Sequence, residues 1–411
     1  MESPEDEPKP TARTLRGLDL VNFLMADVET GVGPFLAIYL AASLHWDPAK
    51  IGVAMSAGGL ASIAAQTPMG ALVDVLKKRR EALAVSALMV ALGCFVTVRL
   101  QRYYPIVTAQ AAVGVVSAFF PPAMAGMTLG IVGARGLTRR VGRNETWNHA
   151  GNVCHAIACG LLGYWFDRRC IFYYVIAVCV ITAAVVFAIR RDDISDRRAR
   201  GSEKPEADGP DSSDPVSFLE ALRNRSLLIF GFCVALFHFA NAAMLPLIGQ
   251  RLSRGDDKTS SLYMAVCIVG AQAVMTPLAM FAGKYASVWG RKAVFLIGFV
   301  ALPIRGVLYT LNDHPYYLIG VQLLDGIGAG IFGVVSVLVI SDLTRGSGRF
   351  NFTQGVVATA TGLGASLSNV IAGFIVQHAG FNAAFLFLAA MAAIGLTVFW
   401  RWMPETLASP S

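Results

Sequence analysis

The chain has 411 residues, of which 55% are hydrophobic and only 15% are charged. Because an ordinary soluble domain carries about 25% charged residues, this composition argues against a soluble enzyme, a disordered chain and a disulfide-bonded secreted scaffold. The net charge of +7 comes without a basic tract interleaved with aromatic residues, so we expect no nucleic-acid partner.

Apolar runs long enough to cross a bilayer follow one another along the chain. A membrane-spanning helix needs about 20 mostly apolar residues, and short loops that carry charges, Pro or Gly separate twelve such runs. The predicted spans are 18–42, 51–73, 81–99, 104–132, 145–166, 171–190, 226–250, 261–282, 292–311, 316–341, 353–377 and 381–402.

The segment 191–225 interrupts this pattern. It is rich in Pro, Gly, Ser and acidic residues, with too little apolar content to form a core. We therefore expect a cytosolic linker between two six-helix bundles, with short tails at the ends of the chain. The predicted divisions are a tail at 1–17, a bundle at 18–190, a linker at 191–225, a bundle at 226–403 and a tail at 404–411.

The distribution of Lys and Arg predicts the orientation. If the N-terminus is cytosolic, 25 of the 34 basic residues fall on the cytosolic side, eight fall outside, and Arg305 alone lies within a span. Without the basic residues of the central linker, 17 still fall on the cytosolic side against eight outside. Since basic residues accumulate in cytoplasmic loops, both termini are predicted to be cytosolic in a multi-pass protein of the plasma membrane.

Small residues recur at one nearly constant offset between the two halves. The pairs are separated by 210 to 214 positions: Gly70 and Gly283, Pro34 and Pro246, Gly114 and Gly328, Gly163 and Gly373. Their common order and spacing predict two homologous halves, a construction frequent in secondary transporters.

The loop after the second span of each half carries a recurring pattern. The stretch GKYASVWGRK (283–292) supplies Gly283, Gly290, Arg291 and Lys292, and GALVDVLKKRR (70–80) supplies Gly70 and Asp74. The stretches resemble the signature G-x-x-x-D-R-x-G-R-K/R of the major facilitator superfamily. A small residue lets helices approach, and an acidic residue at a helix end can pair with Arg to latch a gate. The alternative is ordinary positive charge on the cytosolic side.

The resemblance extends over essentially the whole chain and implies an all-α membrane protein. Its twelve transmembrane helices would form two pseudo-symmetric six-helix bundles, the major facilitator fold. The coupling mechanism is not implied, because Gln110 stands where drug/proton antiporters of the superfamily carry Arg. The fifth span, CHAIACGLLGYW (154–165), also lacks their Pro.

Ionisable residues inside the predicted spans are the main functional signal, because a charge is costly in hydrocarbon and usually lines a pathway. Asp27 and Glu29 lie about 14–17 Å from the cytosolic end of the first span at 1.5 Å per residue. His238 and Asn241 share one face of the seventh span, which is the symmetry mate of the first span. Together they predict a substrate or proton site near the midplane. The alternative is a buried polar network that only fixes helix packing.

Arg305 is the one cation deep within a predicted span. Asp325, in the following span, lies at a compatible depth for an ion pair, and Gln322 precedes it by about one turn. Two interpretations stay open: a structural ion pair, or an anion-binding site.

These observations predict a secondary active transporter that moves a small organic molecule by alternating access, with proton-coupled efflux of a metabolite or drug-like compound favoured. The alternatives are a proton-coupled importer of a nutrient or anionic metabolite, and a non-transporting membrane sensor or scaffold. The chain has no Walker lysine motif, H-E-x-x-H or G-x-S-x-G. We therefore expect no enzymatic activity, no cofactor and no metal. The expected partners are the substrate, protons and the lipid bilayer, and the expected state is a monomer.

Overall fold

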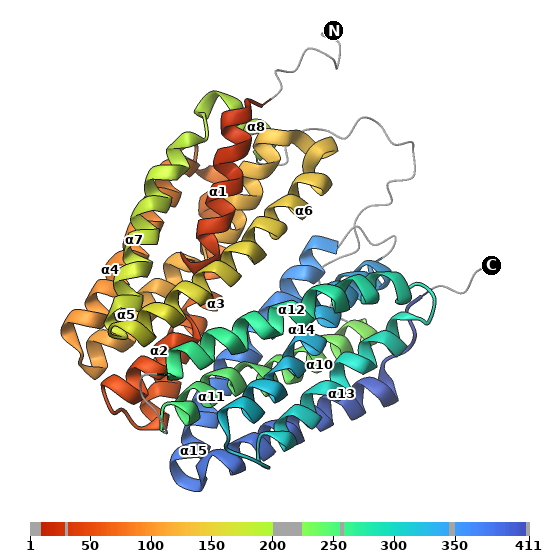
Figure 1. Ribbon diagram of the computed structural model, residues 1–411. Helices are drawn as coiled ribbons and strands as arrows, with labels where there is room; N and C mark the ends of the chain where they lie inside the picture. The colour runs from red at the N-terminus through yellow and green to blue at the C-terminus, as the bar shows by residue number, and fades with distance from the viewer. Residues whose placement is uncertain (1–9, 29–31, 200–223, 255–258, 345–349, 408–411) are drawn as a thin grey trace. The chain divides into compact units, whose positions relative to one another are not determined.

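The computed structural model describes residues 10–28, 32–199, 224–254, 259–344 and 350–407, and within these ranges it contains helices and loops but no strand (Figure 1). The chain divides into two compact units. The first unit comprises Met1–Gly33 and Ala61–Pro210, and the second unit comprises Pro34–Leu60 and Asp211–Ser411. The predicted boundaries of the bundles, linker and tails stay predictions.

The first unit is built mainly from long apolar helices. Its main elements are α1 (Ala12–Val28), α4 (Arg79–Leu100), α5 (Tyr103–Ser117), α6 (Phe120–Trp165), α7 (Arg169–Val185) and α8 (Asp196–Ala199). Two short 3₁₀ turns, η2 (Val186–Ala188) and η3 (Arg191–Asp193), follow α7. Helix α6 breaks at Gly133, whose φ of 64° is favourable only for a residue without Cβ. The predicted span 104–132 is therefore divided between α5 and the first part of α6, and the part of α6 after Gly133 contains nearly all of the predicted span 145–166.

The second unit contains the remaining helices. They are α2 (Pro34–Ile38), the π-helical turn η1 (Tyr39–Ser43), α10 (Arg225–Ala242), α11 (Met244–Leu252), α12 (Ser260–Tyr285), α13 (Arg291–Leu308), α14 (Pro315–Leu343) and α15 (Phe350–Trp402). Helix α3 (Pro48–Val75) begins in this unit and ends in the first. Gly380 breaks α15 with a φ of 83°, so the last two predicted spans also share one element.

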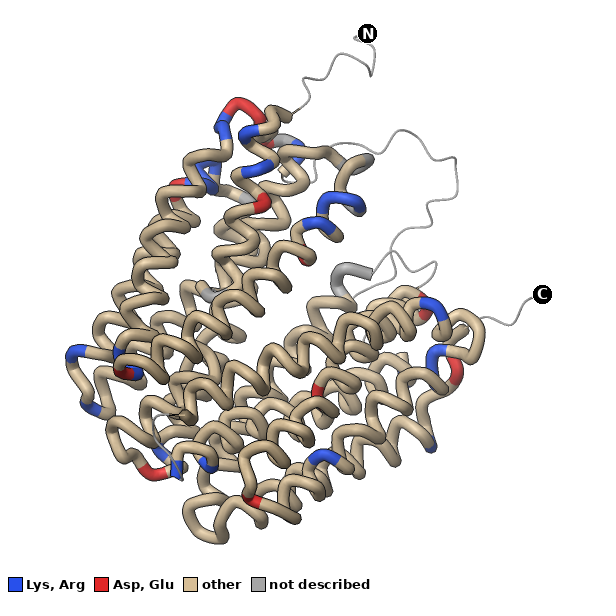
Figure 2. Tube along the Cα trace, in the orientation of Figure 1, with Lys and Arg blue, Asp and Glu red and all other residues tan. Residues whose placement is uncertain are grey.

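The helices have the length and composition of membrane spans. Among the described residues, seven helical segments are long and apolar enough to cross a bilayer, and the segment Thr353–Trp402 extends over 50 residues. Lys and Arg gather near helix ends in each unit, while the middles of the helices carry few charges (Figure 2). This arrangement confirms the predicted all-α membrane fold.

Aromatic side chains form much of the core of the second unit. Phe295 contacts Phe230, Phe299 and Phe399 with ring centroids 5.2–5.9 Å apart, and these rings are at most 1% exposed. Because buried aromatic rings provide large apolar contact areas, this cluster holds α10, α13 and α15 together.

Helix α3 meets α15 along a contact that we call the α3–α15 seam, made by Gly52, Ser56 and Gly59 on α3 and Ser366, Asn369 and Gly373 on α15. The Ser56 hydroxyl donates to the carbonyl oxygen of Ser366 at 2.5 Å. A Cβ added at Gly52 would lie 2.3 Å from the carbonyl oxygen of Asn369. Glycine is therefore needed for the backbones to approach this closely.

Candidate functional site

A polar network lies among the apolar helices of the second unit, and we call it the Arg305 network. Four helices supply it: α13 carries Arg305 and is followed by Tyr309 at its C-terminal cap, α14 carries Gln322 and Asp325, α10 carries Asn241, and α11 begins with Met244. Gln322 and Asp325 are three residues apart on a helix, so their side chains share one face. Two of the four helices, α10 and α13, also pack through the aromatic core described above.

Arg305 is the centre of the network and is only 1% exposed. Its Nη1 donates to Asp325 Oδ1, and its Nη2 donates to Asn241 Oδ1. Nε and Nη2 also contact the Met244 sulfur at 3.3 and 3.1 Å. The predicted pair with Asp325 is thus present, and every guanidinium nitrogen has a partner.

The network continues from Asp325 to an aromatic hydroxyl. Gln322 Nε2 donates to Asp325 Oδ2 at 3.2 Å, and Tyr309 OH donates to Gln322 Oε1. Gln322 and Tyr309 are fully buried, whereas the Asp325 side chain is 21% exposed. A chain of hydrogen bonds therefore links a buried phenol to a carboxylate that is open on one side.

His238 lies beside this network without a hydrogen bond to it. Its ring packs edge-on against Phe332, with centroids 4.6 Å apart, and Nε2 is buried without a partner among the described residues. The Asp325 carboxylate acts electrostatically on the imidazole. Of the residues predicted for the site, the structure therefore joins Asn241, Arg305, Gln322 and Asp325 directly and places His238 nearby.

The two carboxylates predicted for the first span, Asp27 and Glu29, cannot be placed in the site. The backbone of Asp27 belongs to α1, but its side chain lies outside the described residues, and Glu29 lies outside them entirely. Their role stays a prediction.

The predicted gating loop of the second half is held by acidic residues from distant segments. Arg291 Nε pairs with Asp342 at 3.1 Å, and its Nη1 donates to Ser287 Oγ at 3.1 Å. The backbone N–H groups of Arg291 and Lys292 donate to the two carboxylate oxygens of Glu405 at 2.9 and 3.0 Å. Glu405 thereby caps the start of α13, where unpaired N–H groups favour a negative charge.

The glycines of the two loops differ in their surroundings. Gly290 has a φ of 93°, and a Cβ there would lie 2.4 Å from Glu405 Oε2, so this position requires glycine. A Cβ at Gly70 would meet nothing within 4 Å, and one at Gly283 would only touch a Val334 methyl group at 4.0 Å. Among the described residues, neither Gly70 nor Gly283 lies against a neighbouring backbone, and the gating role of both stays a prediction.

The first-half loop carries an ion pair that the sequence did not predict. Arg79, whose side chain is 2% exposed, pairs with Asp196 at 2.8 Å. Asp74 is helical, but its side chain lies outside the described residues, so its gating role stays a prediction. Arg80 donates to the carbonyl oxygen of Ile189 at 2.6 Å.

A second charged cluster in the first unit was not predicted as a site. Asp19 on α1 accepts from Arg140 at 2.6 Å and from Arg143 at 2.9 and 2.6 Å, and Arg140 Nε donates to Asn144 Oδ1 at 2.8 Å. Burial lowers the pKa of Arg140, while the hydrogen bond to Asp19 raises the pKa of Arg143. The polarity of the first span and the basic loop at 135–143 were visible in the sequence. Their pairing over more than 120 residues was not.

The two arginines of this cluster should differ in their contribution to stability. Replacing Arg140 with Gln leaves the 7% exposed Asp19 carboxylate with one partner and removes the donor to Asn144 Oδ1, and we expect a loss of about 2–3 kcal/mol in the free energy of unfolding. Arg143→Gln should cost clearly less, because the Arg143 side chain is 59% exposed and solvent screens its charge. Denaturant-induced unfolding of both variants in detergent measures the difference, and equal losses would contradict this assignment.

The described residues contain no group of His, Cys, Asp and Glu side chains placed to hold a metal ion. The chemistry available in the Arg305 network is charge pairing, hydrogen bonding and recognition of a polar ligand at the exposed side of Asp325.

Comparison with known proteins gives a consistent result. The sequence model of one family, the Major Facilitator Superfamily, matches residues 18–279 and 271–411. An uncharacterised MFS-type transporter of Mycobacterium tuberculosis (strain H37Rv) is 46% identical over 397 residues, covering 97% of this chain and 94% of that protein. Sugar efflux transporter A of Dickeya chrysanthemi is 21% identical over 411 residues, covering 95% of this chain and 97% of that protein.

The fold of this chain is also found among solved structures of transporters. The crystal structure of a variant of the nucleoside transporter NupG superposes with a TM-score of 0.77 at 15% identity, covering 94% of this chain and 99% of that chain. At this level of identity the likeness shows the fold alone.

Proposed function

The chain belongs to the Major Facilitator Superfamily, and from that premise we propose that it is a secondary active transporter that exports a small organic molecule by proton-coupled alternating access. The family makes it a multi-pass membrane protein with a small-molecule substrate. The proposed substrate class is a metabolite or drug-like compound, and the proposed location is the plasma membrane, with both termini cytosolic and a monomeric state.

The Arg305 network carries this proposal. A buried ion pair among apolar helices is costly, and ionisable groups within membrane helices usually line substrate or ion pathways. Asp325 is 21% exposed although both of its oxygens are bonded within the network. A polar ligand can therefore reach this carboxylate from one side while the network holds it in place.

Asp27 or Glu29 is the proposed carrier of the coupling proton. Both belong to the predicted first span, 18–42, which is the repeat mate of the predicted span 226–250. A rise of 1.5 Å per residue predicts that they lie close to the midplane. Binding sites at the interface of two repeats near the midplane are typical of secondary transporters.

The α3–α15 seam is the proposed closure on the predicted outer side. It joins residues of the first sequence repeat to residues of the second, and its glycines permit backbone contact. In alternating access, two such surfaces separate in one state and pack in the other. The seam would therefore open once in each transport cycle.

Export is the proposed direction, since the relative from Dickeya chrysanthemi is named as an efflux transporter. The alternative is a proton-coupled importer in which Arg305 binds an anion. It has less support, because the guanidinium is already bonded to Asp325 and Asn241 and an anion would have to displace them. The third possibility is a non-transporting sensor or scaffold. It does not require the α3–α15 seam to open, so it leaves the glycine contacts of the seam without a role in function.

The proposal is tested in two stages. Comparing the metabolites exported by a deletion strain and its parent identifies a candidate substrate. Purified protein in proteoliposomes should then move that substrate when a pH gradient is imposed, and Asp27→Asn or Glu29→Gln should reduce this flux to background. The matched control is Glu145→Gln, an exposed residue of α6. Unchanged flux in both test variants would overturn proton coupling at these residues.

A further inference from the structure

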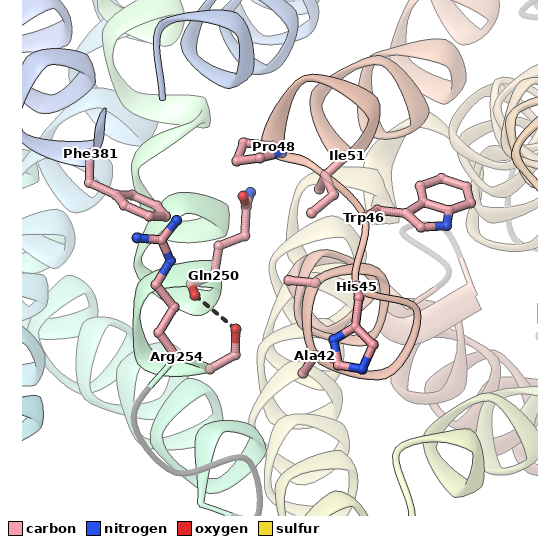
Figure 3. A pocket seen from close by; sticks show the side chains of 10 residues that line it. Ala42, His45, Trp46, Pro48, Ile51, Gln250, Arg254 and Phe381 are labelled. Atoms are coloured by element: carbon pink, nitrogen blue, oxygen red, sulfur yellow. Dashed lines mark hydrogen bonds between the residues drawn. The ribbon is translucent and has the colours of Figure 1, made fainter. Parts of the chain in front are cut away.

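A cavity of about 260 Å³ is lined by residues of the second unit that do not belong to the Arg305 network, and Figure 3 shows its lining. We call it the Gln250 pocket. One wall comes from the connection between η1 and α3, with His45 and Trp46, and from Ile51 in the first turn of α3. The facing wall comes from Gln250 in α11, from Arg254 just beyond this helix and from Phe381 beside the break in α15. The volume is close to the lower end of the range for small-molecule sites.

Gln250 is the polar group buried in this pocket. The residue is 5% exposed, and its Oε1 has no hydrogen-bond partner among the described residues. Its side chain extends from α11 into the space between the two walls (Figure 3). A buried amide oxygen without a partner costs free energy, and a ligand hydroxyl or N–H group would satisfy it.

Arg254 provides a positive charge beside this amide. Its guanidinium lies 4.6 Å from the ring centroid of Phe381, which holds the side chain against the wall by a cation–π contact. The neighbouring Arg251 pairs with Asp313, whereas Arg254 has no ion-pair partner in the described part of the chain. The planar guanidinium group can bind a carboxylate through two parallel hydrogen bonds.

The opposite wall is aromatic and apolar. His45 has a φ of 53°, a left-handed conformation that is uncommon for residues other than glycine, and this backbone turn brings its imidazole to the pocket. Ile51 projects from the first turn of α3 toward Gln250 (Figure 3). A flat apolar body would therefore fit between the two walls.

We propose that the Gln250 pocket binds a small organic anion composed of a carboxylate, a flat apolar body and one hydrogen-bond donor. Arg254 binds the carboxylate, Gln250 accepts from the donor, and Phe381 and Ile51 pack against the body. The amide of Gln250 offers either an oxygen or an NH₂ group to the ligand, depending on its rotation. The pocket is distinct from the predicted midplane site.

If the protein transports by alternating access, as proposed above, this ligand would also stabilise one conformation of the chain. The wall with His45 precedes α3 and its seam with α15, so it moves with α3 when the seam opens. A ligand that contacts both walls binds best while they are together, and by linkage it stabilises the closed seam. The site would then act as a brake on transport.

The test is isothermal titration of the purified full chain in detergent with 3-hydroxybenzoate, 3-hydroxybenzamide and benzoate. We expect saturable binding of 3-hydroxybenzoate, and binding of the uncharged amide about tenfold weaker or more, since charge-assisted hydrogen bonds contribute about 1.5–3 kcal/mol. Arg254→Gln should weaken binding of 3-hydroxybenzoate by about tenfold or more and remove the preference for the acid. Gln250→Leu should remove the preference for 3-hydroxybenzoate over benzoate.

The matched control is Arg102→Gln, an exposed arginine at the start of α5, which should leave all three affinities unchanged. Absence of saturable binding to the unmodified chain, equal affinity for the acid and the amide, or an equal effect of Arg102→Gln would each overturn the proposal. The titration uses no pH gradient and measures no transport. A failed titration therefore contradicts only the Gln250 pocket, and a failed flux assay contradicts only the proposed function.

Discussion

Replacing Asp325 with Asn is expected to lower the free energy of unfolding by about 3–5 kcal/mol and to abolish transport. The reason is that Arg305 is 1% exposed and Asp325 is its only carboxylate partner among the described residues. Without that partner a charge remains buried in the apolar core of the second unit. Unfolding by SDS in mixed micelles measures the stability, and proteoliposome flux measures the activity.

The matched control for this change is Asp313→Asn. Asp313 also pairs with an arginine, Arg251, but its side chain is 75% exposed. Solvent screens the exposed Asp313 carboxylate, and the 11% exposed Arg251 keeps its hydrogen bonds to the Tyr309 carbonyl oxygen and to Asn382. This variant should therefore unfold almost like the parent and retain its flux. If both variants lose the same stability, the burial of the Arg305 pair has no energetic consequence and our account of it is wrong.

A double variant separates the two interpretations of the pair. Arg305→Met with Asp325→Leu replaces both charges with apolar groups, and such replacements are often neutral or stabilising. A purely structural pair predicts recovery of both stability and flux. A pair that lines the transport pathway, which we propose, predicts recovery of stability without recovery of flux.

The helices and part of the Arg305 network were predictable for a simple physical reason. A bilayer requires long apolar runs, so the spans are visible as composition alone. Arg305 and Asp325 could be paired because each is costly in isolation and their depths agreed. Gln322 followed from helical spacing, as it lies three residues before Asp325.

Contacts that join distant segments through ordinary residues were not predictable. Met244 contacts Arg305 through its sulfur, and methionine in an apolar span carries no polar signal. Glu405 reaches Gly290 and the start of α13 from beyond the last helix, although its position in the sequence indicates only a tail. In the loop signature Ser287 occupies the usual acidic position, and the carboxylate that pairs with Arg291 is Asp342, 51 residues away.

The sequence also did not reveal which segments pack into the same compact unit. The repeat assigns residues 34–60 to the first half, yet they pack within the second unit. The cause is the close fit at Gly52, Gly59 and Gly373, whose added Cβ atoms would lie 2.3–2.5 Å from atoms of the facing segment. Glycines within apolar spans are frequent, so their sequence positions alone do not reveal their contacts.

Cross-linking the α3–α15 seam is expected to stop transport completely, because alternating access requires this seam to open. The pair Gly59→Cys and Ser366→Cys is well placed, since a Cβ at position 59 would lie 3.3 Å from the Ser366 Cβ and disulfides have Cβ atoms about 3.5–4.5 Å apart. Cys154 and Cys170 are replaced by Ser in the background, because the other native cysteines are buried. Each single variant is a control that cannot form the cross-link.

The most direct test of alternating access is therefore flux through the double variant before oxidation, after oxidation and after reduction, with cross-linking verified by mass spectrometry. Our account predicts that flux of the identified substrate falls to background when the disulfide forms and returns when it is reduced. In each single variant, oxidation and reduction should leave the flux at its starting value. Undiminished flux through fully cross-linked protein would contradict it.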